Sequence, residues 1–299
     1  ASQTSVDYLD TRDFAMRPRR WLEIMSKNKS SITFSPPFGY ELVERRLRES
    51  KNMDYDLSSW RIAGIGAETI RPEPLQKFAK TLKQCGFDEK AFLPCYGMAE
   101  CCLAISFADV DQPLTITSVD GEELANNNKA IAFDARLAHR EAKFIDCGRV
   151  LPDHDIEIRD DQGRSLPERS IGVIHVRGPS VMSHYFDNTE ETENTLQNGW
   201  LNTGDIGFLI NDHIHITGRE KDLIIINGRN IWPQDLEHLA EQQPEIRTGD
   251  ALAFSAPDFN GATTVVVVMQ CRERNEINRA DIVARVEAAH AALRAQQQR

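Results

Sequence analysis

Residues 60–100 read WRIAGIGAETIRPEPLQKFAKTLKQCGFDEKAFLPCYGMAE, in which two short apolar runs flank a helical pattern. The first run, Trp60 to Ile65, predicts a strand with glycine near its end. Pro72 opens the expected helix, because proline is tolerated in a first turn. The second run, residues 91–96, predicts another strand that ends in a turn at Gly97. A strand, a helix and a strand in this order indicate α/β class and a mainly parallel, doubly wound sheet.

Residues 1–105 continue this alternation, with a further helix expected over Tyr40 to Ser50. Residues 106–217 differ, because apolar and polar residues alternate there with period two, as in Asp155 to Arg159. Hairpin-type turns such as Asn211-Asp212 separate these runs. We therefore expect part of a doubly wound sheet subdomain, followed by a β-rich subdomain built as a small barrel or a curved antiparallel sheet.

Residues 109–146 are the least regular stretch of the second subdomain, with Asn126-Asn127-Asn128 as an expected exposed loop tip. Residues 218–299 form a third predicted unit, a small α+β domain. Its two strands and two helices are expected over Leu223 to Ile226, Pro233 to Glu241, Ala262 to Met269 (as a buried strand) and Ala280 to Arg294. The polar junction from Gly218 to Asp222 is a candidate hinge between the second and third units.

The composition limits the class of protein. Hydrophobic residues make up 40% and charged residues 27% of the 299, as in ordinary globular proteins. A net charge of −11 disfavours nucleic acid and anionic lipid as partners, because an acidic surface repels both. The six cysteines contain no C-x-x-C pair, so reduced thiols are expected. No apolar run approaches the roughly eighteen residues of a membrane span and no export signal is visible, so we expect a cytoplasmic protein.

Two segments follow directly after predicted strands. Small residues at Gly66 and Ala67, before Glu68, let a backbone approach a flat ligand closely, although such glycines also occur in plain tight turns. In the second segment, Tyr96 can stack on a base, and Glu100 can hold a hard cation such as Mg²⁺. The alternative for this segment is a core tyrosine and a glutamate that favours a helix N-terminus.

Two later segments carry further candidates. In Thr203-Gly204-Asp205, a carboxylate beside glycine can accept hydrogen bonds from two vicinal hydroxyls, as on a ribose, or can be an ordinary turn aspartate. In Gly218 to Asp222, Arg219 can contact a ribose or a phosphate. The alternative for this last segment is a solvated run of charges.

The order and spacing of these segments resemble the core motifs of the adenylate-forming superfamily, which includes acyl-CoA synthetases, luciferases and non-ribosomal peptide adenylation domains. That superfamily has Y-G-x-[TA]-E, T-G-D, G-R-x-[KD]-D and P-x-[DE]-[IL]-E in this order. The matching segments here are residues 96–100, 203–205, 218–222 and 233–237.

Within the superfamily, the chain is most similar to fatty acyl-AMP ligases. The segment Ser35 to Tyr40 resembles their S-x-P-N-F-A-Y motif, with a proline and a glycine as departures. Ala99, where many CoA ligases have threonine, also fits. Residues 106–146 make this region longer than in CoA ligases, and in fatty acyl-AMP ligases an insertion is thought to hinder the movement that CoA chemistry needs.

The resemblance implies activation of a fatty acid by ATP and Mg²⁺, in which the carboxylate attacks the α-phosphate, releases pyrophosphate and leaves acyl-AMP. It also implies the following roles: Tyr96 stacks on adenine; Gly66, Ala67, Glu68, Gly97, Met98 and Ala99 surround the nucleotide; Glu100 acts in catalysis by holding Mg²⁺; Asp205 and Arg219 bind the ribose; Lys221 is the hinge; and Phe38 and Gly39 face the acyl chain. For Phe38, an ordinary core position is the alternative.

Two parts of that family's machinery are not found in the sequence, namely a Ser/Thr/Gly-rich loop ending in lysine and a Gly-Lys turn near the end. We therefore expect that the chain lacks an N-terminal part and the extreme C-terminus, and that it adenylates poorly or not at all by itself. The expected acyl acceptor is the phosphopantetheine of an acyl carrier protein or of a polyketide synthase carrier domain. The alternatives are a fatty acyl-CoA synthetase, a non-catalytic nucleotide- or acyl-binding module, or a structural α/β protein.

Overall fold

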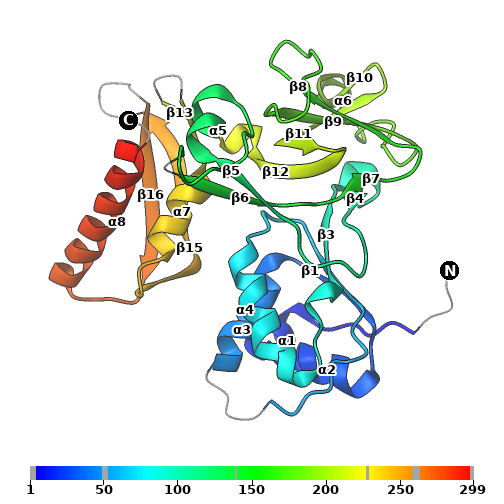
Figure 1. Ribbon diagram of the computed structural model, residues 1–299, viewed down its shortest axis with the longest axis vertical. Helices are drawn as coiled ribbons and strands as arrows, with labels where there is room; N and C mark the ends of the chain where they lie inside the picture. The colour runs from blue at the N-terminus through cyan, green and yellow to red at the C-terminus, as the bar shows by residue number, and fades with distance from the viewer. Residues whose placement is uncertain (1–4, 49–52, 139, 227–228, 258–262, 297–299) are drawn as a thin grey trace.

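The computed structural model describes residues 5–48, 53–138, 140–226, 229–257 and 263–296 (Figure 1). The first of its sheets has the strand order β1-β2-β3-β4-β7. These strands are β1 (Ile32–Ser35), β2 (Ile62–Ile65), β3 (Phe92–Tyr96), β4 (Ser106–Phe107) and β7 (Arg149–Val150). β1, β2 and β3 pair in parallel, whereas β4 pairs antiparallel with both β3 and β7. The predicted α/β class is confirmed.

Among the described residues, four helices precede or connect the parallel strands of this sheet, and two of them are connections (Figure 1, blue to cyan). They are α1 (Thr11–Met16), α2 (Arg20–Asn28), α3 (Pro37–Arg48) and α4 (Pro72–Leu82). The connecting helices α3 and α4 lie on the same face, because the rings of Tyr40 and Phe78 are 5.2 Å apart in an edge-to-face arrangement. The Tyr40 hydroxyl also donates to the Gly64 carbonyl at 3.0 Å. This buried aromatic packing fixes β2 and β3, after which two of the predicted motifs follow.

The second sheet is antiparallel and curved, with the order β10-β11-β9-β8 and with β12 paired to β11 (Figure 1, green to yellow). Its strands are β8 (Asp155–Arg159), β9 (Gly172–Arg177), β10 (Leu196–Gln197), β11 (Trp200–Ile210) and β12 (His213–Arg219). Asn211 and Asp212 join β11 to β12 with φ of 52° and 64°. Positive φ at both positions is what a two-residue type I′ hairpin requires, so the predicted turn is confirmed.

Residues 109–146 are more regular than predicted. They contain β5 (Ile116–Asp120), α5 (Gly121–Asn127) and β6 (Glu141–Ile145), with β5 and β6 paired antiparallel. The expected loop tip is therefore wrong for Asn126 and Asn127, which end α5. The Asp120 carboxylate caps this helix through the Glu122 N–H at 2.8 Å, and Asn128 terminates it with φ of 52°. These caps allow a helix where three asparagines indicate a turn.

The C-terminal region packs α7 and α8 beside a long two-stranded sheet (Figure 1, yellow to red). Its elements are β13 (Ile224–Ile226), β14 (Arg229–Ile231), α7 (Pro233–Glu241), β15 (Ile246–Pro257), β16 (Thr263–Cys271) and α8 (Glu276–Gln296). The expected buried strand corresponds to β16, apart from Ala262, which lies outside the described residues. The prediction that this strand is buried is wrong, because 53% of the Val268 surface is exposed. A two-stranded sheet leaves alternate side chains on an open face.

The remaining short elements are one helix and four 3₁₀ turns. They are α6 (Thr189–Thr195), η1 (Lys83–Cys85), η2 (Glu89–Ala91), η3 (Ala99–Cys101) and η4 (Glu220–Asp222). All six cysteines are free thiols, as predicted. Among the described residues, no helix combines the length and the apolar character that crossing a bilayer requires.

Candidate functional site

Three predicted residues that are far apart in sequence converge where the two sheets meet. Tyr96 ends β3, Asp205 lies within β11 and Arg219 ends β12. The Tyr96 hydroxyl donates to Asp205 Oδ2 at 2.8 Å, and Arg219 Nε lies 3.2 Å from Asp205 Oδ1. Both Tyr96 and Asp205 are buried, with 7% of their surface exposed. The three side chains therefore form one hydrogen-bonded group.

A local irregularity of β11 directs Asp205 toward Tyr96. The pairing of β11 with β9 is interrupted between Asn202 and Ile206, and Gly204 has a φ of 67° that suits glycine. Thr203 Oγ1 accepts the Asp205 N–H at 3.1 Å. On the other side, the register of β11 and β12 places Asp205 directly opposite Arg219. The T-G-D motif is thus a bulge that aims a carboxylate.

The turn after β2 lies close against β3. A Cβ on Gly66 would meet Cys95 Sγ at 2.8 Å and the Cys95 carbonyl oxygen at 2.9 Å, so only glycine allows this approach. A Cβ on Gly97 would lie 1.8 Å from the Leu103 carbonyl oxygen. Ala67 has a φ of 68°, which is uncommon for a residue with a Cβ, and such backbone strain is found at ligand sites. Packing within the protein therefore explains both glycines.

Burial controls the protonation of the two buried groups. Burial raises the pKa of Asp205, while the Tyr96 hydrogen bond and the Arg219 charge oppose that rise. Burial and the Asp205 charge raise the pKa of Tyr96 well above its usual 10, so its hydroxyl stays a donor. A carboxylate has about four acceptor positions, of which Tyr96 and Arg219 use two. Asp205 can therefore accept further hydrogen bonds from a ligand.

A cavity of about 420 Å³ opens onto this group. Six predicted residues line it, namely Ala67, Glu68, Tyr96, Gly97, Asp205 and Arg219. Its other lining residues include Ile145, Cys147, Ile216, Asp222 and Gln234, which were not predicted. Cavities of this size hold small ligands in other proteins. The predicted residues thus line one partly open cavity with polar and aromatic walls.

The remaining nucleotide and hinge candidates do not line this cavity in the described part of the chain. Glu100 Oε1 accepts the Tyr185 hydroxyl at 2.8 Å. Burial and this bond to Glu100 raise the pKa of Tyr185 to about 12. Glu100 lies in the 3₁₀ turn η3, which begins at Ala99 directly after Met98. Lys221 is exposed in the turn after β12. No sequence signal indicates Tyr185.

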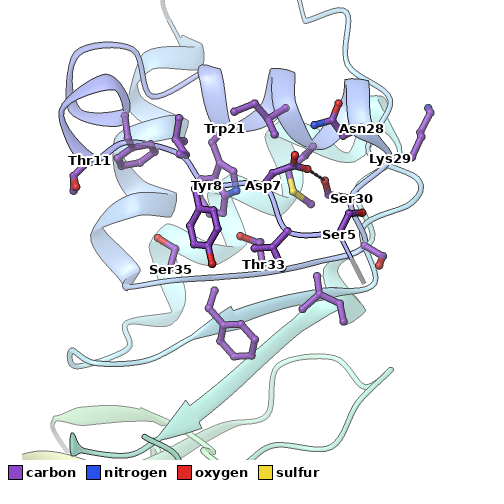
Figure 2. A pocket seen from close by; sticks show the side chains of 18 of the residues that line it. Ser5, Asp7, Tyr8, Thr11, Trp21, Asn28, Lys29, Ser30, Thr33 and Ser35 are labelled. Carbon is purple, nitrogen blue, oxygen red and sulfur yellow. Dashed lines mark hydrogen bonds between the residues drawn. The ribbon is translucent and has the colours of Figure 1, made fainter. Parts of the chain in front are cut away.

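The two acyl-chain candidates differ in exposure. Phe38 is 48% exposed at the start of α3 and lines two cavities, of about 950 Å³ and 740 Å³. Figure 2 shows the larger cavity, in which Tyr8 lies beside Thr33 and Ser35 of β1. Gly39 is buried, and a Cβ there would lie 2.1 Å from Ser35 Oγ, so helix packing explains this glycine.

A model of the family described as AMP-binding enzyme matches residues 4–186. The chain belongs to the AMP-binding enzyme family. Its fold is similar to a solved structure from a study of fatty acyl-adenylate ligases of E. coli and L. pneumophila. The TM-score is 0.90 at 46% identity, over 96% of this chain and 51% of the other.

Two curated relatives of this AMP-binding chain have more specific descriptions. A putative acyl-CoA synthetase of Caulobacter vibrioides is 47% identical over 93% of this chain and 49% of its own length. A medium-chain-fatty-acid–[acyl-carrier-protein] ligase of Moorena producens is 32% identical over 86% of this chain and 45% of its own length. The chain spans about half the length of the curated relatives it matches.

Proposed function

We propose that this chain carries the adenosine-binding site of an enzyme that joins a fatty acid to AMP. One observation carries the proposal: Tyr96, Asp205 and Arg219 are bonded together at the wall of one cavity in a chain of the AMP-binding family. An aromatic ring can stack on a base, a buried acceptor can bind ribose hydroxyls, and a cation can contact a ribose or a phosphate.

In the proposed reaction, a carboxylate oxygen of the fatty acid attacks the α-phosphorus of ATP. A mixed anhydride bond forms, and the bond from the α-phosphorus to the pyrophosphate leaving group breaks. The Tyr96 ring positions the base, and Asp205 accepts hydrogen bonds from the ribose hydroxyls. Arg219 supports the sugar beside Asp205. Positioning and charge neutralisation supply most of the catalysis in such phosphoryl chemistry.

Magnesium is expected for this reaction, and Glu100 fits a role as its protein ligand. The described residues contain no cluster of three or more metal-ligating side chains. Mg²⁺ commonly uses one or two carboxylates together with substrate phosphates, so a single glutamate suits it. When bound, the ion would neutralise phosphate charge. Tyr185 donates to one oxygen of Glu100 and so orients the carboxylate.

The acyl chain and its acceptor are the finer parts of the proposal. We infer that Phe38 contacts the acyl chain, because its ring is half exposed between two cavities. A carrier protein's phosphopantetheine is the proposed acceptor, and the Moorena producens relative is described as ligating fatty acids to such a protein. We also propose Lys221 as the hinge about which the C-terminal region turns.

The alternative acceptor is coenzyme A. The 47% identical Caulobacter vibrioides relative, described as a putative acyl-CoA synthetase, favours it. Product analysis of an enzyme that contains this chain, given ATP, a fatty acid, CoA and a carrier protein, separates the two acceptors. Acyl-carrier protein without acyl-CoA supports the main proposal, and acyl-CoA formation supports the alternative.

Calorimetric titration with a fatty acyl sulfamoyl-adenosine, a non-hydrolysable analogue of acyl-AMP, tests the proposed site. We expect binding to the 299-residue chain, weakened at least about thirty-fold by Asp205→Ala, because a charged acceptor is lost. The exposed turn variant Asp161→Ala is the matched control and should bind normally. An absence of binding, or binding insensitive to Asp205→Ala, would contradict the proposal.

A further inference from the structure

Gln234 lies between the cavity of the proposed adenosine site and the neighbouring cavity of about 740 Å³. Together with Glu68 and Thr69, it lines both. Its Oε1 is buried and has no hydrogen-bond partner among the described residues. A buried acceptor without a donor costs free energy, so a ligand that supplies a donor at this point is favoured.

The position of Gln234 is fixed by its neighbours in sequence. It is the second residue of α7, after Trp232 and Pro233. The Trp232 ring is buried, and a Cβ on Gly218 would lie 3.0 Å from that ring and 3.6 Å from Gln234 Oε1. Directly after Gln234 in the sequence, the Asp235 carboxylate accepts a hydrogen bond from Arg140 Nη1 at 2.8 Å. The backbone at Gln234 is therefore held in place before any ligand arrives.

The charges around the amide determine which ligand group fits. Among the described residues that line this cavity, Glu68, Asp205 and Asp222 are acidic and Arg219 is the one cation. A carbonyl oxygen in such surroundings attracts an N–H or O–H donor and disfavours a phosphate oxygen. Asp205 is the proposed partner of the ribose hydroxyls. Gln234 instead lines the cavity together with Tyr96, whose ring is proposed to position the base.

We propose that the side-chain carbonyl of Gln234 accepts a hydrogen bond from the exocyclic amino group of the purine, and so selects adenine over hypoxanthine nucleotides. This inference rests on the proposed adenosine site. Hypoxanthine has an oxygen where adenine has the amino group, so two acceptors would face each other in the amide orientation of this structure, and pairing would require the amide to turn its Nε2 toward that oxygen. Because Gln234 belongs to α7, the same bond would attach α7 to the bound nucleotide. This helix follows the Gly218–Asp222 junction in the sequence.

The test is calorimetric titration of AMP and IMP into the 299-residue chain and its Gln234→Leu and Gln234→Glu variants. We expect the unsubstituted chain to bind AMP at least about ten-fold more tightly than IMP. Gln234→Leu should lose this preference through weaker AMP binding. Gln234→Glu should keep it, because a carboxylate also accepts. Gln242→Leu is the control, since Gln242 is exposed at the other end of α7.

The outcomes separate this inference from the proposed function. Equal affinity of the unsubstituted chain for AMP and IMP overturns the inference alone, whatever the variants do. A preference for AMP that survives in a folded Gln234→Leu variant, with folding checked by thermal unfolding, also overturns it. Binding of neither nucleotide by the unsubstituted chain contradicts the proposed function, and the inference falls with it.

Discussion

The cavity has two walls of different construction. The strand wall consists of Asp205 on β11 and of Tyr96 on β3 and Arg219 on β12, each of which bonds to Asp205. The helix wall consists of α7 with Gln234, whose acceptor oxygen has no partner among the described residues. The sheets therefore complete one half of the candidate site by themselves, whereas the other half depends on how α7 is attached.

The attachment of α7 and of β14 just before it combines one apolar anchor with polar pairs. Trp232 is buried in a cluster with residues of β5, α5 and β11. Arg71 Nη1 lies 2.9 Å from Glu241 Oε2, and Arg140 Nη1 lies 2.8 Å from Asp235 Oδ2. Asn230 Nδ2 donates to Asn128 at 2.8 Å. Polar pairs can exchange with water, so the helix wall is the half that we expect to detach when the proposed hinge moves.

The largest expected effect comes from removing the apolar anchor. Trp232→Ala should lower the free energy of unfolding by about 3–5 kcal/mol, because it leaves a cavity in a buried cluster. Urea denaturation measures this. Trp200→Ala is the matched control, since Trp200 is half-buried between two arginines and should cost about 1–2 kcal/mol. Equal costs for the two variants would show that Trp232 is not the anchor.

The strand wall should control nucleotide affinity more than stability. Asp205→Asn keeps the shape of the side chain and removes its charge, so AMP binding should weaken about thirty-fold. Calorimetry measures the change, and Asp161→Asn in an exposed turn is the control. Normal AMP affinity in the variant would contradict the assignment of Asp205 to the proposed ribose site, and with it the role of the strand wall in nucleotide binding.

A smaller effect should come from the polar attachment. A double-mutant cycle of Arg71→Ala and Glu241→Ala should give a coupling energy of about 1–2 kcal/mol, because the Glu241 side chain is only 7% exposed. The helical pair Arg17–Asp13 is largely exposed and should couple less. If the two pairs couple equally, Arg71 and Glu241 do not hold the helix wall.

The smallest expected effect is a dependence on pH at the same attachment. Burial lowers the pKa of His238 and the Arg71 charge contributes, while Glu73, Glu241 and Asp235 oppose them. Arg71 Nη1 lies 3.3 Å from His238 Nδ1, and arginine can only donate, so that nitrogen accepts. Protonation of His238 is therefore less favourable in the folded state than in the unfolded chain. As the pH falls below 6.5, the ordinary histidine value, the unfolded chain binds the proton more readily and the free energy of unfolding decreases.

Unfolding free energies measured above and below that pH test this dependence. The unsubstituted chain should lose more stability on acidification than the variant His238→Gln. The difference between the two proteins is the relevant quantity, because burial also lowers the pKa of His175 and His215 and their effect is common to both. Identical losses would mean that His238 does not take part.

The sequence predicts elements well where a local pattern matches the tertiary environment. β2 and β3 are apolar runs whose side chains are mostly buried, so the sequence predicts both strands. β15 was missed, since its first residues include Thr248, Gly249 and Asp250, which do not read as a strand. The sequence does not predict the end of α5, because three asparagines indicate a turn and the N-cap of the helix, Asp120, lies outside that run.

The candidate site divides in the same way. The motifs identified Tyr96, Asp205 and Arg219, whose meeting depends on a bulge and a strand register that no local pattern encodes. Gln234 occupies the variable position of its motif, so the motif gives no reason to select it. Tyr185 is 85 residues from its partner Glu100, and only the folded chain brings them together. The roles of Glu100, Lys221 and Phe38 remain predictions.

The most direct measurement is a crystal structure of the chain with AMP bound. It should place the base against the Tyr96 ring and the ribose hydroxyls within about 3.2 Å of the Asp205 carboxylate, beside Arg219. AMP seated elsewhere in a crystal whose Tyr96–Asp205 cavity is open to solvent would contradict the assignment of that cavity as the adenosine site.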